Sequence, residues 1–175
     1  MLRLPTMIPA AAIVLLLTGC SAAPHLYSVG SDSMQPLIHT GDKVVVDESP
    51  GARTNLHDGD VIAFHHGEYV VLKRILAMPG ETIRGEEQKI FRDGKQVDEP
   101  YLAPVSSEDN AWMRSFPPKK MGAGELFVLG DDRDNSLDSR AEDYGPVRVS
   151  DVVGKYRWTY WHVSAAAKST SPAAK

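Results

Sequence analysis

The body of the chain consists of short β-branched or aromatic runs, each bounded by Gly, Pro or Asp, with no sustained 3.6-residue apolar period. This pattern predicts strands at residues 43–46, 61–64, 69–76, 126–129 and 152–160. Asp93-Gly94 lies between the extended flanks of residues 90–97 and predicts a tight hairpin. The sequence therefore predicts a mainly β domain of coiled antiparallel sheets with barrel-like closure.

The first nineteen residues have the features of a signal or anchor segment. Arg3 supplies a positive start, and the apolar run of residues 7–19 is short against the roughly 20 residues that span a bilayer. It ends in Leu17-Thr18-Gly19-Cys20, which is similar to the cleavage box of bacterial lipoproteins. Cys20 is thus a candidate for lipidation, with an uncleaved membrane anchor as the alternative. Either version places the following domain outside the cytoplasm, at a membrane.

The remaining residues are enough for a single domain, predicted at residues 20–164. Without Arg3, 18 of the 19 Lys and Arg remain against 23 Asp and Glu, a formal charge of −5. Because no basic cluster accompanies this acidic balance, a nucleic-acid partner is not expected. Residues 165–175 contain Ala, Ser, Lys, Thr and Pro without a hydrophobic period, which predicts a disordered tail.

The sequence Ser33-Met34-Gln35-Pro36 can present a nucleophile. Pro36 disfavours helical geometry at Gln35, so Ser33 is expected in an extended or turning segment. Met34 offers an unbranched apolar side chain that suits a substrate groove or a membrane face. Taken alone, the motif is more typical of an ordinary surface turn. A serine hydroxyl also needs a base that takes its proton before it can attack.

Lys73 and Arg74 form a charged pair inside an apolar strand. Period-two alternation places Lys73 on the expected core face, together with Tyr69, Val71 and Ile75. Burial lowers the pKa of a lysine, and the neutral amine can then act as a general base. Arg74 is expected on the opposite face, either solvated or paired. The alternative is an edge-strand lysine whose ammonium group reaches water.

A polar block closes the set, with the sequence Gly130-Asp131-Asp132-Arg133-Asp134-Asn135-Ser136-Leu137-Asp138-Ser139-Arg140. Ser136 can form a hydrogen bond with the lysine amine, while Asp138 and Arg140 can pair and brace the loop. A calcium loop is the alternative, because Asp132, Asp134, Ser136, Asp138 and Asp143 echo its oxygen spacing. However, Leu137 stands where that loop needs Gly, and flanking helices are missing. No metal is therefore expected.

In this order the blocks resemble those of bacterial type I signal peptidases, the membrane-associated Ser–Lys proteases of peptidase family S26 that remove secretory leaders. The resemblance covers about residues 28–160. It implies that Ser33 is the nucleophile and Lys73 the base, without a cofactor. It implies oxyanion donors at the Ser33 backbone N–H and the Ser31 hydroxyl, and supporting roles for Ser136, Asp138 and Arg140.

The resemblance also implies the fold that signal peptidases share with self-cleaving repressors, with residues 86–124 as a small inserted lobe. Exported preproteins are the implied partners, along with membrane lipid. Two positions depart from the family pattern: Asp132 stands where Asn is usual, and Leu37 where many members carry Thr. Neither changes the Ser–Lys pair.

Several other interpretations remain open. A Ser-His-Asp triad would use His39, His65 or His66 as its base. A specialised processing peptidase of a conjugation or pilus system would use the same chemistry on other substrates. A self-cleaving repressor would need an N-terminal DNA-binding domain where this chain has its leader. A non-catalytic lipoprotein would retain the fold without turnover.

Overall fold

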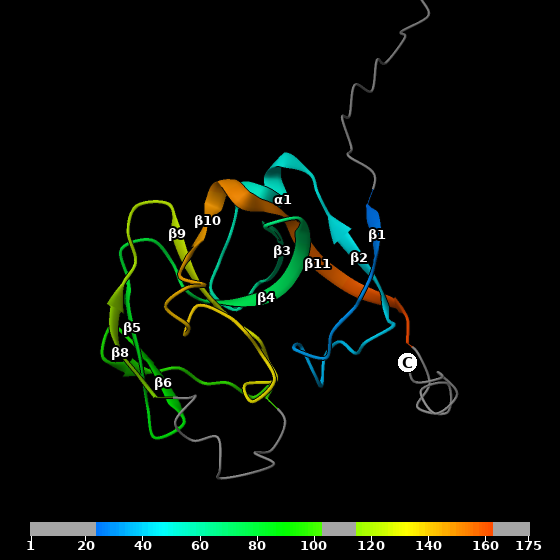
Figure 1. The fold of residues 1–175 in the computed structure, drawn as a ribbon. Helices are drawn as coiled ribbons and strands as arrows, with labels where there is room; N and C mark the ends of the chain where they lie inside the picture. The colour runs from blue at the N-terminus through cyan, green and yellow to red at the C-terminus, as the bar shows by residue number, and fades with distance from the viewer. Residues whose placement is uncertain (1–23, 103–114, 163–175) are drawn as a thin grey trace, which may run out of the picture.

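The structure, a computed structural model, describes residues 24–102 and 115–162 (Figure 1). The expected leader (residues 1–19), Cys20 and the expected tail (residues 165–175) lie outside the described residues. Within the described ranges, no helix has the length and apolar character needed to cross a bilayer.

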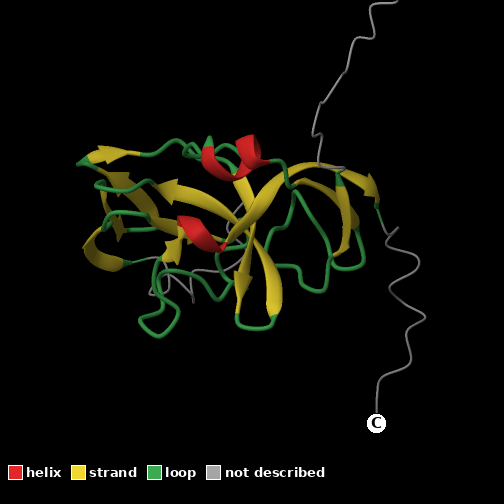
Figure 2. Ribbon diagram, turned by 90° about the horizontal axis from the view of Figure 1, so that it is seen from above, coloured by secondary structure: helices red, strands yellow, loops and turns green. Residues whose placement is uncertain are grey.

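Strands dominate the fold, as the sequence pattern predicts, and helix is confined to short segments (Figure 2). The five predicted strands correspond to β2, β3, β4, β9 and β11, each ending within one or two residues of its expected bounds. In chain order the elements are β1 (His25–Ser28), β2 (Lys43–Asp47), α1 (Pro50–Thr54), β3 (Val61–His66), β4 (Tyr69–Ala77), β5 (Thr82–Glu86), β6 (Lys89–Arg92), β7 (Lys95–Gln96), β8 (Phe116–Lys120), β9 (Glu125–Leu129), β10 (Val147–Arg148), the 3₁₀ segment η2 (Val149–Asp151) and β11 (Val152–Trp161).

The main sheet has seven strands in the order β1-β2-β11-β3-β4-β9-β10, and every pair is antiparallel. The expected barrel-like closure is wrong, because within the described residues β1 and β10 form the two edges and do not pair with each other. The geometry explains this: β10 is two residues long and pairs with β9 alone, so it offers too little edge to close the sheet. The antiparallel, mainly β prediction is confirmed.

A second sheet of four strands has the order β7-β6-β5-β8 and lies beside β9 (Figure 1). The expected hairpin is present: β6 and β7 are joined by Asp93 and Gly94, whose φ angles of 48° and 78° suit a tight two-residue turn. This sheet begins at β5, ahead of the start expected for the inserted lobe at residue 86.

The two sheets share a hydrophobic core. One cluster joins β4 and β9 of the main sheet to the second sheet through Leu76, Phe127, Ile83 and Phe116. This cluster contains Leu76 and Ala77, and another cluster contains Ile75, so the end of β4 is covered on both faces, and burial extends back to Lys73. The simple alternation expected for this strand is therefore wrong: Arg74 is buried like Lys73, and Tyr69 is exposed.

Candidate active site

Ser33 lies in the turn segment that connects β1 to β2. The segment is held by backbone hydrogen bonds from Gln35 N to Asp32 O at 3.0 Å and from Ile38 N to Met34 O at 3.0 Å. Met34 and Ile38 are buried in a cluster with β2 and β3, so their side chains anchor the turn on the sheet. Both buried side chains follow Ser33 in the chain, so they restrict the position of its hydroxyl from one side.

The ammonium of Lys73 contacts the hydroxyl of Ser33. Lys73 Nζ donates to Ser33 Oγ at 2.7 Å, although the two residues are 40 positions apart in sequence, and both side chains are buried. Desolvation lowers the pKa of Lys73 from 10.5 to about 8, opposed by the negative charge of Asp138 and assisted by the positive charge of Arg140. A neutral amine at this place can accept the Ser33 proton, because the same contact then runs from hydroxyl to nitrogen.

Arg74 is paired, one of the two outcomes expected for it. Its Nε and one terminal nitrogen donate to the two oxygens of Asp131 at 2.8 and 2.6 Å, and its other terminal nitrogen donates to Gly59 O at 2.8 Å. The guanidinium also lies 3.9 Å from the ring centroid of Tyr101. Arg74 thus fastens β4 to the start of the polar block, while Lys73 contacts Ser33.

The polar block, residues 130–140, follows β9 and approaches the Ser33 segment at the centre of the molecule (Figure 1). Asp132 N donates to Ser33 O at 3.0 Å. A Cβ on Gly130 would lie 2.3 Å from Ser136 Oγ and 2.5 Å from Ser33 O. Only glycine fits here, because the backbone of the block lies against the backbone of the Ser33 segment.

The three supporting residues expected from the block form one hydrogen-bonded group. Asp138 is fully buried, pairs with Arg140 through Oδ1 at 2.7 Å and accepts the Ser136 hydroxyl at 2.7 Å. Asp138 also accepts the N–H of Gly130 at 3.1 Å. Because a hydroxyl that donates still has lone pairs, Ser136 can also accept from Lys73. That contact stays a prediction.

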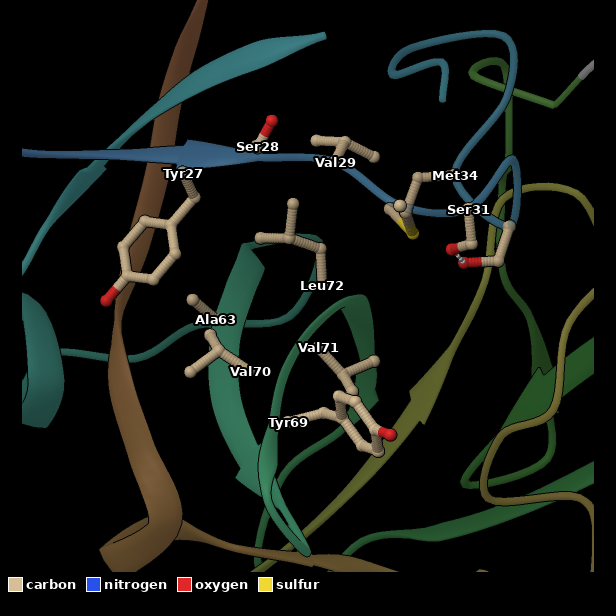
Figure 3. Close-up of a pocket in the computed structure, with 12 residues that line it drawn as sticks. Tyr27, Ser28, Val29, Ser31, Met34, Ala63, Tyr69, Val70, Val71 and Leu72 are labelled. Carbon is tan, nitrogen blue, oxygen red and sulfur yellow. Dashed lines mark hydrogen bonds between the residues drawn. The ribbon is translucent and has the colours of Figure 1, made fainter. Parts of the chain in front are cut away.

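Ser31 lies next to the Ser33 hydroxyl, with its Oγ 3.3 Å from Ser33 Oγ. A groove of about 380 Å³ opens beside this pair, between the end of β1 and the start of β4 (Figure 3). Met34, expected to bind substrate, lines this groove and is also buried against the core. The lining is mainly apolar and consists of Tyr27, Ser28, Val29, Gly30, Ser31, Ser33, Met34, Ala63, Tyr69, Val70, Val71 and Leu72.

The histidines considered as bases have other neighbours. His65 and His66 lie at the exposed end of β3, where the His66 ring stacks on Tyr144 with centroids 4.1 Å apart. His39 Nδ1 lies 3.8 Å from Asp42 Oδ2.

In the calcium interpretation Asp138 would be a metal ligand. Its carboxylate oxygens instead accept hydrogen bonds from Arg140, Ser136 and the backbone N–H of Gly130.

Sequence reasoning missed a second set of buried charges beside the site. Asp131 belongs to the polar block, but the sequence gives no signal that it is the partner of Arg74, 57 positions away. Arg133 pairs with Glu99, and both side chains are almost fully buried. The charge of Glu99 gave no signal, because it lies in a polar, Pro-rich stretch that resembles an ordinary loop.

Comparison with known proteins identifies the family of this chain. The family described as "Signal peptidase, peptidase S26" matches residues 2–161. The chain belongs to the S26 signal peptidase family. It is therefore a serine endopeptidase, a hydrolase of peptide bonds.

Individual relatives agree with this membership. Signal peptidase I S of Bacillus subtilis is 32% identical over 136 residues, covering 75% of this chain and 73% of that protein. The probable signal peptidase I-1 of Synechocystis is 29% identical over 172 residues, covering 93% of this chain and 83% of that one. A crystal structure of a signal peptidase I from Enterococcus faecalis is 30% identical with a TM-score of 0.50, covering 57% of this chain and 95% of that chain.

Proposed function

We propose that this S26 family member is a membrane-tethered endopeptidase that removes signal peptides from exported preproteins, with Ser33 as nucleophile and Lys73 as general base. The observation that carries the proposal is the buried contact of 2.7 Å between Lys73 Nζ and Ser33 Oγ beside an apolar groove. Family membership supports the substrate class, because the relatives are named as signal peptidases.

The proposed reaction needs only these side chains and water. Neutral Lys73 accepts the Ser33 proton while Oγ forms a bond to the scissile carbonyl carbon. The resulting Lys73 ammonium gives that proton to the leaving amine nitrogen as the C–N bond breaks, which leaves an ester on Ser33. Lys73, neutral again, takes a proton from a water molecule that attacks the ester. The new carboxyl end departs and the proton returns to Ser33.

The substrate is proposed to bind as an added strand along β4. Within the described residues, β9 pairs with β4 only from Arg74 onward, whereas β3 pairs with β4 along residues 69–74. Residues 69–72 therefore present one backbone edge beside the groove, and Tyr69 and Val70 are exposed there. An extended peptide can extend the sheet at such an edge, and shallow apolar pockets then select small side chains near the cut.

The pH dependence of preprotein cleavage tests the proposed base. Because burial lowers the pKa of Lys73 to about 8, the amine is mostly charged at pH 7 and mostly neutral at pH 9. We expect kcat/KM for a preprotein carrying a signal peptide to rise about tenfold between these values. Steady-state assays of the purified full chain in detergent measure this, with N-terminal sequencing of the product. A flat profile over this range would exclude an amine base with such a pKa.

Ser31 is proposed to donate to the oxyanion, beside the backbone N–H of Ser33. We expect Ser31→Ala to lower kcat by roughly 10²–10³-fold with little change in KM, because the donor acts when negative charge develops. Ser28→Ala is the matched control, since Ser28 lines the same groove and should retain full turnover. A Ser31→Ala enzyme with kcat within twofold of wild type would reduce Ser31 to an ordinary turn serine.

The tether is proposed to lie in the leader, either as lipid on Cys20 or as an uncleaved N-terminal anchor. The catalytic domain would then stand outside the cytoplasm, where exported preproteins emerge. Mass spectrometry of the mature N-terminus distinguishes the two: diacylglyceryl-Cys20 indicates the lipid anchor, and an N-terminus that includes residues 1–19 indicates the spanning segment.

A further inference from the structure

Two histidines and a buried aspartate lie together away from the Ser33–Lys73 contact. His39 and Asp42 flank the turn that leads into β2, and His162 directly follows β11. One possible ligand atom from each residue lies within 4.8 Å of the other two. The group joins parts of the chain 120 positions apart, because β11 pairs with β2 and sets Trp161 opposite Lys43.

The separations suit ligands of one small metal ion. Zn²⁺ binds imidazole nitrogen and carboxylate oxygen at about 2.0–2.2 Å, and tetrahedral geometry then separates neighbouring ligand atoms by about 3.3 Å. Here Nδ1 of His162 lies 3.1 Å from Asp42 Oδ2, and Nδ1 of His39 lies 3.8 Å from the same oxygen. An ion between them would need only small side-chain rotations.

The carboxylate at the centre of the group is already held in place. The Asp42 side chain is fully buried, and its Oδ2 accepts the backbone N–H of His39 at 2.9 Å. A buried carboxylate requires positive charge or hydrogen bonds to offset its lost hydration. His39 and His162 are partly exposed by contrast, so an ion can reach them from solvent.

The chain contains a second copy of this turn, which provides an internal comparison. His39-Thr40-Gly41-Asp42 and His57-Asp58-Gly59-Asp60 share the pattern His-x-Gly-Asp, and each leads into a strand. In the second turn His57 N donates to Asp60 Oδ2 at 2.8 Å, and His57 Nδ1 lies 3.7 Å from that oxygen. The backbone and histidine geometry of the two turns is therefore the same.

The turns differ in the group that completes them. Lys155 of β11 lies 2.6 Å from Asp60, and its ammonium supplies positive charge but has no lone pair to give a metal. At the first turn His162 takes the corresponding place, and an imidazole is a metal ligand. In the second turn the carboxylate of Asp60 is therefore neutralised by the Lys155 ammonium. In the first turn Asp42 lies beside the His162 imidazole, which can bind a metal ion together with Asp42 and His39.

We propose that His39, Asp42 and His162 bind a divalent transition-metal ion of the Zn²⁺ type. Two imidazoles with one carboxylate favour such an ion over Mg²⁺ or Ca²⁺, which prefer oxygen ligands throughout. The ion would join the end of β11 to the segment that carries Ser33, where Thr40 N also donates to Asp32 Oδ1 at 2.8 Å. It has no part in the peptide-bond chemistry, so its role is structural and independent of the proposed function.

Isothermal titration of the full chain with ZnCl₂ tests this site, in a Cys20→Ser background that removes the competing thiol. We expect one Zn²⁺ per chain with a Kd on the order of 1 μM or below, and a melting temperature raised by about 5 °C or more at saturation. His162→Ala and His39→Ala should each weaken binding beyond the roughly 10–100-fold that loss of an outer-shell partner costs. His57→Ala, at the second turn, should bind Zn²⁺ like wild type.

His162 is largely exposed, so its replacement by Ala leaves the fold intact and keeps the comparison meaningful. Undiminished Zn²⁺ affinity in His162→Ala would contradict the site, as would equal losses in His57→Ala. Binding of Zn²⁺ to wild type with a Kd above about 1 mM would also contradict the site.

Discussion

Replacing Lys73 by Met should remove turnover and make the protein more stable at neutral pH. The Met side chain fills the same volume without an amine, so Ser33 loses its proposed base and we expect kcat to fall by roughly 10³-fold or more. Lys73 is 3% exposed, and the shift of its pKa from 10.5 to about 8 means that the buried ammonium costs up to about 3 kcal/mol. We expect a gain of about 2–3 kcal/mol in the free energy of unfolding at pH 7, measured by urea denaturation.

The stability difference should close as the pH rises. The pKa of Lys73 is lower in the folded than in the unfolded chain, so between about pH 8 and 10.5 the unfolded chain binds more protons. The stability of wild type therefore rises through that window relative to Lys73→Met. Below about pH 8 the buried ammonium destabilises wild type by its full amount.

Two variants control this experiment. Ser33→Ala should also abolish turnover while leaving the ammonium buried, so it should not gain this stability. Lys155→Met removes a lysine that is also buried but is paired with Asp60, so it should lose stability and retain turnover. Full activity in Lys73→Met would remove Lys73 from the mechanism, whatever the stability shows.

Arg74→Met should destabilise the fold by about 3–5 kcal/mol, the largest stability loss we expect from a single change near the site. The substitution leaves the Asp131 carboxylate, whose side chain is fully buried, without the bidentate partner that compensates its charge. It also frees the carbonyl of Gly59 and uncovers the ring of Tyr101. Denaturant unfolding monitored by circular dichroism measures the loss.

A double variant separates the buried charge from general damage to packing. Arg74→Met with Asp131→Leu removes both charges and should recover much of the loss. Arg84→Met breaks the exposed pair with Glu86 in the second sheet and should change stability by no more than about 0.5 kcal/mol. A similar small effect for Arg74→Met would mean that the Arg74–Asp131 pair is not required to hold β4 to the polar block.

Much of this architecture follows from local pattern. β-branched runs with Gly or Asp at their ends gave the bounds of β2, β3, β4, β9 and β11, because strand propensity and turn chemistry act over a few residues. Asp93-Gly94 fixed the β6–β7 hairpin for the same reason. The pairing of Asp138 with Arg140 is also local, and the structure has it at 2.7 Å.

Features that depend on distant contacts could not be obtained in this way. Alternation placed Arg74 opposite the core, but Asp131, Gly59 and Tyr101 surround its guanidinium there, and nothing within β4 signals these contacts. Sheet closure depends on the length of β10, which is two residues and has no strand signature. The group of His39, Asp42 and His162 arises only when β11 pairs with β2.

The Ser33–Lys73 contact stands between these cases. Strand periodicity correctly predicts that Lys73 is buried. Its partner Ser33 lies 40 positions away, and only the resemblance to a known family predicts that the two side chains meet. The structure adds the reason that the pair meets: Asp132 holds the Ser33 carbonyl, Gly130 allows the backbones to touch, and Arg74 fixes β4 to the same block.

Covalent trapping of the proposed nucleophile tests the proposed Ser33–Lys73 mechanism most directly. The full chain is incubated at pH 9 with a β-lactam-type inhibitor, whose strained amide opens on attack and stays attached as an ester. Intact-mass and peptide-mapping mass spectrometry then locate the adduct. The mechanism predicts one adduct per chain on Ser33, absent from Ser33→Ala and formed far more slowly by Lys73→Met. An adduct that persists in Ser33→Ala, or that forms in Lys73→Met at the wild-type rate, would contradict it.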